Sequence, residues 1–516
     1  MKVLLTAVFV AGTAVLMAQS DQLAPPKPGD GARFDVLIRG ARVMDGSGNP
    51  WLRADVGITG DRITAVGTLT AATATRVIDA GDRILAPGFI DVHSHAAEGL
   101  TRPALHQAQP LIAQGITTLV VNPDGGGPVD LAAQRAAIEQ ARPGPNVALL
   151  IGHGSVRRTV MKESRAEPAA AELQQMKDLV RRGMQEGAFG LSSGLFYVPG
   201  SFAKTEEVIE LTKVAAEFGG LYTSHVRDEG NYDAGVRASV AEVIRIAEEA
   251  RTIGVVSHMK ALGKDSWGLG PALIKDMEEA RARGVQVFAD QYPYEASSTN
   301  LRAALAPGGV EPTEAVVTEN LRRRNGPDAV LIAQFAEDRT LAGKTLTEIA
   351  RLKGISPVQA AIAMIRAGGA SIVSFNMSEP DIEAIMKAPF TMASSDGGLP
   401  TPGVGQPHPR DYGAFARRLA VYVRERKVVP LEFAIRSMTS LPAAVFGIPD
   451  RGAIRPGAIA DVVIFDPARV RDAATYTAPQ ALAEGMSDVL VNGVPVLLDG
   501  RFTDASPGRV LKKGLR

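Results

Sequence analysis

Residues Gly88-Phe89-Ile90-Asp91-Val92-His93-Ser94-His95 form an apolar run that ends in two histidines. Residues two apart in a β-strand point to the same side of a sheet, so the imidazoles of His93 and His95 can face one site. Buried parallel strands that end in polar residues are typical of a barrel, where catalytic groups gather at the carboxyl ends of the strands. The stretch therefore predicts a barrel strand that carries two candidate metal ligands.

The same rhythm continues through the middle of the chain, where short apolar runs alternate with amphipathic stretches. Helical periodicity is clear at Ala171–Glu186 and Val236–Arg251. The strand candidates are Gly88–Val92, Ile116–Val121, Val147–Gly152, Phe189–Leu191, Leu221–Ser224, Val255–Ser257, Val285–Ala289 and Phe390–Ser394. This alternation favours an α/β fold of the (β/α)8 TIM-like barrel type over a doubly wound open sheet, which is the alternative.

The barrel is predicted over residues 87–451, and the segments on either side of it have a different amino-acid pattern. Short strand-like runs separated by Gly and Asp turns occupy residues 34–86 and 452–516, which predicts one small β-sandwich domain built from both chain ends. Residues 296–345 lack the barrel rhythm and are expected to be an insertion after the seventh strand. An additional strand candidate, Ser371–Phe375, leaves the strand count open.

The N-terminal residues 1–20 have the composition of a signal peptide. Lys2 precedes an apolar run from Val3 to Ala18, with small residues near its end. An uncleaved anchor is the alternative, although the run is short for a membrane span. We expect a periplasmic or secreted protein that leaves the membrane after signal cleavage.

Composition restricts both the partners and the ligands. The chain has 56 basic and 56 acidic residues, so it has no net positive charge with which to hold nucleic acid, and a small-molecule substrate is expected. Cysteine is absent, which excludes a thiol nucleophile and thiolate metal sites. Histidine and carboxylate side chains are the strong metal ligands that remain.

Four further residues could complete a metal centre with His93 and His95. His225 and His258 each end an apolar run, and a buried structural histidine is the alternative for each. Asp124 and Asp396 precede glycines, so each could also be an ordinary turn residue. The shared placement of the four histidines at strand ends favours a common site.

Carboxylates give this site its expected chemistry. A carboxylate such as Asp396, beside metal-bound water, can accept the water's proton and later return it to a leaving amine. Asp91, inside the strand end, could orient a ligand histidine as a hydrogen-bond acceptor.

Taken together, these motifs resemble the amidohydrolase superfamily, and within it the D-aminoacylase or N-acyl-D-amino-acid deacylase family. The segments that carry the resemblance are Asp91–His95, Gly190–Gly200, Ser224–Gly230, Ser257–Lys260, Asp290–Tyr294, Ser394–Gly397, Pro407–Gly413 and Arg451–Gly457. The resemblance as a whole extends from about Phe34 to the C-terminal strands, so it covers nearly the whole chain after the signal.

The resemblance implies a centre of one or two divalent ions, usually zinc. His225 and His258 would hold the tighter ion, and His93, His95 and Asp396 would surround the second position. Asp124 stands where many family members have a bridging Cys, so soft sulfur is replaced by hard oxygen. The fourth-strand segment Gly190–Ser193 has no Lys, so the carboxylated-lysine bridge of hydantoinase-like relatives is not expected.

The resemblance also implies roles around the metal centre. Tyr292 would donate a hydrogen bond to the oxyanion formed during amide cleavage, and Lys260, Ser298 and Arg410 would bind the substrate α-carboxylate. Tyr197 would shape the acyl or side-chain pocket.

The implied reaction is hydrolysis of the linear amide bond of an N-acyl-D-amino acid, with metal-bound hydroxide as nucleophile and Asp396 as general base and acid. A D-dipeptidase or a cyclic amidase on the same fold is the alternative enzyme, since a dipeptide presents the same amide bond. The non-enzymatic alternative is an exported binding protein without turnover.

Overall fold

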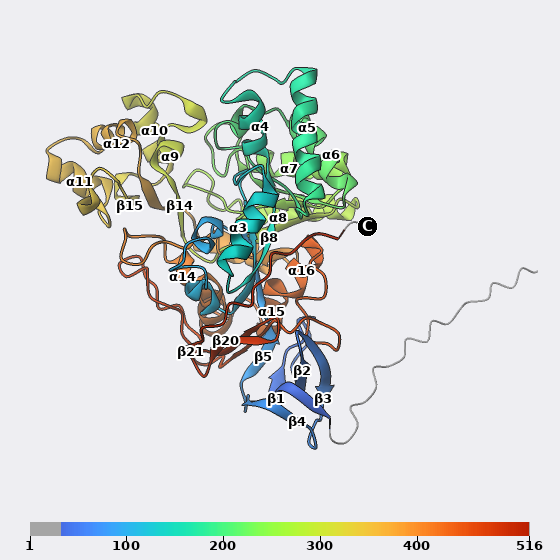
Figure 1. Cartoon of the computed structure of the whole chain (residues 1–516). Coiled ribbons are helices and arrows are strands. Elements are labelled where there is room, and N and C mark those ends of the chain that lie inside the picture. The colour runs from blue at the N-terminus through green and yellow to red at the C-terminus, as the bar shows by residue number, and fades with distance from the viewer. Residues whose placement is uncertain (1–31, 515–516) are drawn as a thin grey trace, which may run out of the picture.

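The computed structural model describes residues 32–514, so the predicted signal peptide lies outside the described residues. Figure 1 shows three parts: a barrel with its helices, a β domain below it, and a lobe set to one side of the barrel. Among the described helices, none combines the length and the apolar character that crossing a membrane requires.

Parallel strands at the centre of the molecule form the predicted barrel. Each strand hydrogen-bonds to the next in chain order. These strands are β6 (Phe89–Ser94), β7 (Ile116–Val121), β8 (Asn146–Leu149), its continuation β9 (Ile151–Gly152), β10 (Gly190–Gly194), β11 (Leu221–His225), β12 (Gly254–Val256), β13 (Val287–Gln291) and β17 (Thr391–Ala393). They coincide with the eight strand candidates of the sequence.

The barrel closes where the end of β6 meets the loop after β17. The His95 amide donates to the Gly397 carbonyl at 2.7 Å, and the Asp396 amide donates to the His93 carbonyl at 2.9 Å. Because the first and last strands are joined, the fold is a closed barrel and not a doubly wound open sheet.

Helices cover the outside of the barrel, as the periodicity predicts. The two helices expected from the sequence are α5 (Ala170–Gln185) and α7 (Val236–Ala250), and α7 buries residues three and four apart on one face. The remaining barrel helices are α1 (Ala97–Leu100), α2 (Gln109–Ile112), α3 (Leu131–Ala141), α4 (His153–Met161), α6 (Thr205–Glu217), α8 (Gly270–Ala282), α13 (Glu379–Lys387), α14 (Arg410–Arg417) with the π-helix Arg418–Glu425, α15 (Leu431–Met438) and α16 (Ser440–Phe446).

Two apolar cores hold the barrel together. The strand faces that point outward pack against the helices and form the larger core. The inward faces form a separate core with Leu441 and Phe446 of α16. The interior is therefore filled by side chains, which leaves the strand ends as the place for a site.

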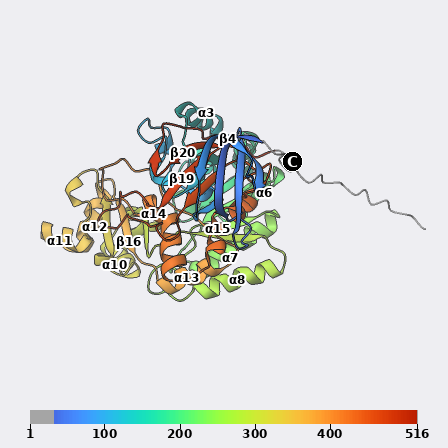
Figure 2. The same cartoon turned by 90° about the horizontal axis from the view of Figure 1, so that it is seen from below.

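Both ends of the chain build the β domain. Its strands are β1 (Arg33–Val43), β2 (Leu52–Thr59), β3 (Arg62–Gly67), β4 (Thr73–Asp79), β5 (Ile84–Pro87), β18 (Val462–Phe465), β19 (Met486–Val491), β20 (Val494–Leu498) and β21 (Arg501–Phe502). All of them belong to one hydrogen-bonded sheet, in which β5 pairs with β18, and Figure 2 shows the N-terminal and C-terminal strands side by side. Strands from both chain ends contribute to an apolar core of this domain, and a smaller cluster around Phe34 and Leu37 packs separately.

After β21 the chain returns to the barrel. The Val147 amide of β8 donates to the Arg509 carbonyl at 2.9 Å, and the Leu511 amide donates to the Val147 carbonyl at 2.7 Å. The C-terminal segment therefore adds a short parallel bridge, Val147 with Val510, to the edge of a barrel strand.

The insertion after the seventh strand is larger than the sequence predicts. It forms a lobe with its own antiparallel sheet and its own apolar core. Its elements are β14 (Ala296–Asn300), α9 (Leu301–Leu305), α10 (Glu314–Arg323), β15 (Val330–Gln334), α11 (Leu346–Lys353), α12 (Pro357–Arg366) and β16 (Ser371–Phe375). The additional strand candidate Ser371–Phe375 thus belongs to the lobe, and the lobe extends past residue 345 to this strand.

A buried polar network joins the β domain to the barrel. Asp461 accepts hydrogen bonds from Arg451, from the Asn492 amide at 2.7 Å and from Asn146 Nδ2 at 3.1 Å. The Arg451 guanidinium also donates to Asn492 Oδ1 at 2.9 Å. Because these groups are almost wholly buried, the loss of one of them leaves the others without a hydrogen-bond partner or counter-charge, and water cannot replace it.

We expect Asp461→Ala to lower the free energy of unfolding by about 3–5 kcal/mol, since Arg451 would stay buried without a counter-charge. Urea denaturation measures the loss. Asp82→Ala, which removes the exposed partner of Arg53, is the matched control and should not shift the urea midpoint. Equal midpoints for the two variants would contradict a structural role for the Asp461 network.

Candidate metal centre

The carboxyl ends of the barrel strands bring together every metal ligand predicted from the sequence. His93 and His95 lie at the end of β6, His225 ends β11, and His258 follows β12 by two residues. The two carboxylates come from the loops after β7 and β17, and are Asp124 and Asp396. These residues are up to 303 positions apart in the sequence, so the barrel is what makes them neighbours.

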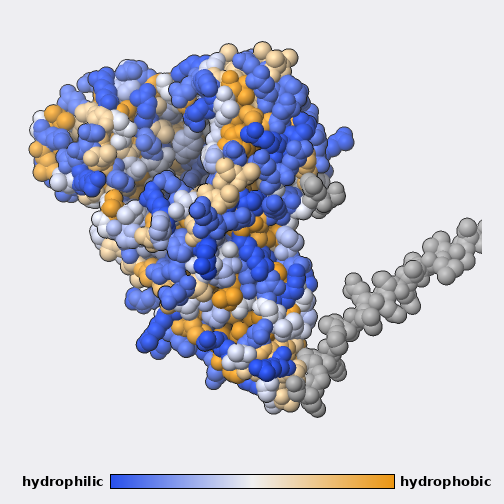
Figure 3. All heavy atoms as spheres, viewed as in Figure 1, coloured by the Kyte–Doolittle hydropathy of each residue, from blue (hydrophilic) through white to orange (hydrophobic). Residues whose placement is uncertain are grey.

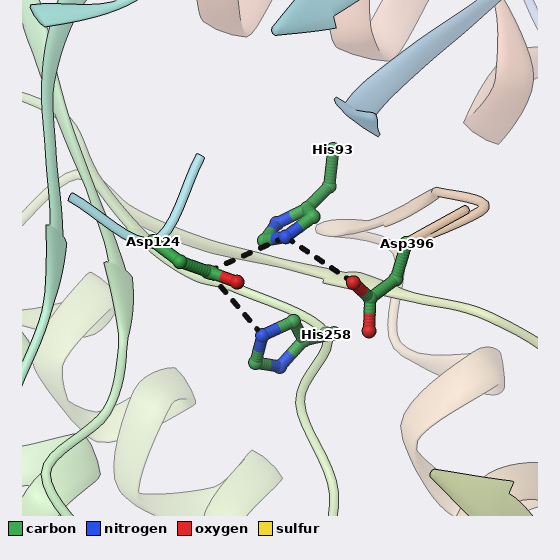
Figure 4. A group of neighbouring side chains, drawn as sticks. All are labelled: His93, Asp124, His258 and Asp396. Carbon is green, nitrogen blue, oxygen red and sulfur yellow. Dashed lines mark ion pairs between the residues drawn. The ribbon is translucent and has the colours of Figure 1, made fainter. Parts of the chain in front are cut away.

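Four of these side chains form a compact group, shown in Figure 4. His93 Nε2 lies 3.3 Å from Asp124 Oδ1 and 3.5 Å from Asp396 Oδ1. His258 Nε2 lies 3.5 Å from Asp124 Oδ1. In Figure 4 the two imidazoles and the two carboxylates point toward a common centre.

The two remaining histidines also lie close to Asp124. His95 Nε2 lies 3.4 Å from Asp124 Oδ2 and 3.1 Å from Asp396 Oδ1. His225 Nδ1 lies 3.9 Å from Asp124 Oδ1 and 2.9 Å from His258 Nε2. Asp124 therefore contacts all four histidines, as expected of a bridging ligand.

Left-handed backbone places three of the ligands. The φ angles of Asp124, His258 and Asp396 are 55°, 33° and 48°. Such conformations cost about 1–3 kcal/mol for a residue other than glycine, and they collect at functional sites. At His258 a bond from its backbone amide to Asp290 Oδ1, at 2.9 Å, helps to hold the conformation.

Asp91 supports the centre in a different way from the one the sequence suggests. Its carboxylate accepts hydrogen bonds from the Ser395 amide, at 2.9 Å, and from the Ser395 hydroxyl, so it bonds to the residue before Asp396 and to no imidazole. Burial raises the pKa of Asp91 to about 6 despite these bonds. Asp91 also accepts a hydrogen bond from the His93 backbone amide at 3.3 Å, so it contacts a ligand histidine through the backbone and not through the imidazole. Its carboxylate reaches across to the loop after β17 because that loop is adjacent to β6.

The donor atoms of the centre fit a divalent cation. Both ring nitrogens of His93, Asp124 Oδ1 and His225 Nε2 are buried and lack hydrogen-bond partners among the described residues. Buried polar atoms normally have partners, so an unpaired set of imidazole nitrogens and carboxylate oxygens indicates a bound metal ion. Imidazole and carboxylate ligands suit zinc.

Electrostatics at the centre favour positive charge. Burial disfavours the charged form of Asp124 and Asp396, yet the neighbouring cationic groups hold the pKa of both carboxyls well below the usual value. In turn, the carboxylates overcome burial and raise the pKa of His95 to about 9 and that of His258 to about 10. The negative charge that retains these protons can attract a divalent cation in their place.

Glu229 is a site residue that the sequence reasoning missed. Its Oε1 lies 3.0 Å from His258 Nδ1, and it also accepts a hydrogen bond from Lys260. Its other oxygen lies 3.9 Å from His225 Nε2. When Glu229 accepts the proton of His258 Nδ1, His258 Nε2 is left free to bind a metal. The position of Glu229, four residues after His225 in one motif, was the available signal.

One cavity of about 820 Å³ beside the metal ligands is lined by the predicted oxyanion donor Tyr292 and by all the predicted substrate-binding residues, which are Tyr197, Lys260, Ser298 and Arg410. Figure 3 shows the recess between the lobe and the barrel, on a largely hydrophilic face. Arg410 donates to Asp396 Oδ2 at 2.6 Å, and its guanidinium carbon lies 4.7 Å from the centroid of the Tyr292 ring. The Tyr292 hydroxyl is buried and has no hydrogen-bond partner among the described residues.

Comparison with known proteins matches this chain to amidohydrolases over most of its length. Residues 76–497 match the model of the amidohydrolase family. An N-acyl-D-glutamate deacylase from Alcaligenes xylosoxydans xylosoxydans is 38% identical over 504 residues, which cover 93% of this chain and 97% of that protein. A D-aminoacylase from the same organism is 35% identical over 516 residues, or 94% of this chain and 99% of that protein.

Solved structures give the same result. An N-acyl-D-glutamate deacylase from Bordetella bronchiseptica, complexed with zinc and a phosphonate inhibitor that mimics the tetrahedral intermediate, has a TM-score of 0.82 and 37% identity. The match covers 93% of this chain and 100% of that chain. A structure of D-aminoacylase has a TM-score of 0.82, 36% identity and the same coverage.

We expect Glu229→Gln to weaken zinc binding by about 10–100-fold, because the neutral amide holds the proton of His258 Nδ1 less well than the carboxylate does. Titration of metal-free protein with zinc in the presence of a competing chelator measures the affinity. Glu249→Gln, an exposed change on α7, serves as the control. Unchanged zinc affinity in Glu229→Gln would exclude this positioning role.

Proposed function

Because this chain belongs to the amidohydrolase family, we propose that it hydrolyses the linear amide bond of N-acyl-D-amino acids in a metal-dependent reaction. The observation that carries this proposal is a metal-ligand cluster at the barrel mouth, with Asp396 beside it and a cationic cavity around it. Relatives named as deacylases of D-amino acid derivatives match nearly the whole chain and support the choice of substrate.

Two overlapping sets of residues would hold one or two zinc ions. His225 and His258 form one set, His93, His95 and Asp396 the other, and Asp124 contacts both. When bound, zinc supplies Lewis acidity that acidifies water and polarises the amide carbonyl. With an aspartate oxygen in the bridging position instead of sulfur, the centre can accept harder cations than a thiolate-bridged centre accepts.

Asp396 is the proposed general base and acid. Its Oδ1 faces His93 and His95, while its Oδ2 accepts a hydrogen bond from Arg410 at 2.6 Å. Arg410 and the imidazoles, acting against burial, hold the pKa of Asp396 well below its usual value, so the group is a carboxylate at neutral pH. In this form it can take a proton from the attacking water and pass it to the leaving nitrogen.

The cavity residues complete the proposed reaction. The Tyr292 hydroxyl, which has no partner in the described structure, can donate a hydrogen bond to the oxyanion. Burial raises the pKa of Tyr292 well above its usual value, so the hydroxyl keeps its proton. Arg410, Lys260 and Ser298 can then bind the α-carboxylate of the substrate.

A D-dipeptidase remains the alternative enzyme, because a dipeptide and an N-acyl amino acid share the amide bond and the α-carboxylate. A cyclic amidase is disfavoured because β10 carries no Lys to form a carboxylated bridge. Competition between N-acetyl-D-amino acids and D-dipeptides for the zinc-loaded protein separates the first two substrate classes.

We expect zinc-loaded protein to release carboxylate from some members of a panel of N-acyl-D-amino acids. Asp396→Asn should lower kcat by at least about 100-fold, because the proton shuttle is lost. The metal content of this variant is measured as well, since Asp396 is also a candidate ligand. Asp178→Asn, an exposed change on α5, is the control. Failure across the whole panel would contradict the proposed function.

We further propose that the protein is exported to the periplasm or beyond the cell, which rests on the composition of residues 1–20. We expect Lys2→Glu together with Val8→Asp to retain the protein in the cytoplasm, since export requires the positive and apolar regions of a signal. Cell fractionation followed by N-terminal sequencing of the mature protein measures both location and cleavage. Equal export of the altered and unaltered chains would contradict this proposal.

A further inference from the structure

One buried cation on the cavity wall has no role in the proposed reaction. Arg324 follows α10 in the lobe, its relative exposure is 2%, and it lines the same cavity as the metal ligands. Its Nε has no hydrogen-bond partner, and it forms no ion pair with any carboxylate of residues 32–514. The charge therefore stays uncompensated by the described protein.

The neighbours of Arg324 are neutral. With the Asn376 amide turned so that both its ends are satisfied, its oxygen accepts a hydrogen bond from Arg324 at 3.1 Å. The guanidinium carbon lies 5.8 Å from the centroid of the Tyr232 ring. Burial raises the pKa of Tyr232, so this hydroxyl carries no negative charge at neutral pH.

Other cations nearby have carboxylate partners. Lys260 and Arg410 line the cavity and pair with Glu229 and Asp396. Arg322, two residues before Arg324, pairs with carboxylates at the surface. Arg324 thus differs both from the other cations of the cavity and from its neighbour in sequence.

A structural role does not account for this arrangement. The backbone amide of Arg324 bonds to the carbonyls of Asn320 and Leu321 at the end of α10, which any residue could do. Arginine keeps its charge in proteins, and a buried charge is costly unless it has a counter-charge. On a cavity wall, the ligand can supply that counter-charge.

We propose that Arg324 binds a second carboxylate of the substrate, so that the preferred substrates are N-acyl derivatives of acidic amino acids. This inference rests on the proposed function, because it assigns the α-carboxylate to Arg410 and Lys260 in the barrel. The planar guanidinium of Arg324 suits bidentate binding of a carboxylate.

The first test compares acidic and isosteric neutral substrates. We expect the zinc-loaded protein to prefer N-acetyl-D-glutamate or N-acetyl-D-aspartate over N-acetyl-D-glutamine or N-acetyl-D-asparagine by about 100-fold in kcat/KM. Arg324→Gln should abolish this preference, mainly through KM, with neutral substrates changed less than about threefold. Arg324→Lys, which keeps the charge but not the bidentate geometry, should give an intermediate preference.

Arg322→Gln is the matched control, since it removes an exposed guanidinium near the same helix end. It should leave both substrate classes unchanged. Equal or better hydrolysis of the neutral substrates by the unaltered protein would overturn the inference while leaving the proposed function intact. An equal loss on both substrate classes in Arg324→Gln would assign Arg324 a structural role.

A second measurement does not depend on turnover. Isothermal titration of the unaltered protein should show tighter binding of free D-glutamate than of D-glutamine, and Arg324→Gln should remove the difference. The melting temperature of Arg324→Gln should equal or exceed that of the unaltered protein, because a buried unpaired charge is removed. Inactivity on all N-acyl amino acids together with selective D-glutamate binding would overturn the proposed function alone. Equal binding of the two ligands would overturn the role of Arg324.

Discussion

The hydrogen bonds between the end of β6 and the loop after β17 hold the first strand of the barrel to the last. The same bonds fix the backbone of His93, His95 and Asp396, so the contacts that close the barrel also position three metal ligands. Asp91 reinforces this junction from the interior through Ser395. A barrel that failed to close here would lose three ligands together, and the remaining ligands lie on other strands.

Around this junction, buried side chains of opposite charge lie in contact with one another. Asp124 lies among four imidazoles, Asp396 pairs with Arg410, and Glu229 pairs with Lys260. Each charge is buried beside one of opposite sign, which offsets the cost of removing both from water. The arrangement also keeps the carboxylates ionised, and ionised carboxylates are needed both for holding a cation and for accepting a proton.

The sequence carried enough information to predict the barrel and most of the centre. Each barrel strand is an apolar run followed by polar residues, and the ligands lie directly at those boundaries. Glu229 was missed although its place four residues after His225 was a signal. The partner of Asp91 could not be predicted, because it depends on how loops from different strands meet. The extent of the lobe was underestimated because Ser371–Phe375 has the apolar character of a barrel strand but pairs with β14 and β15.

The pairing of β5 with β18, and of the C-terminal segment with β8, has a consequence for biosynthesis. A ribosome makes the first five strands of the β domain long before it makes their partners. Those strands must stay without β18 to β21 until nearly the whole chain has been synthesised, and closing so long a loop is slow. The N-terminal strands of this domain therefore cannot complete their sheet until the barrel between them and β18 has been synthesised.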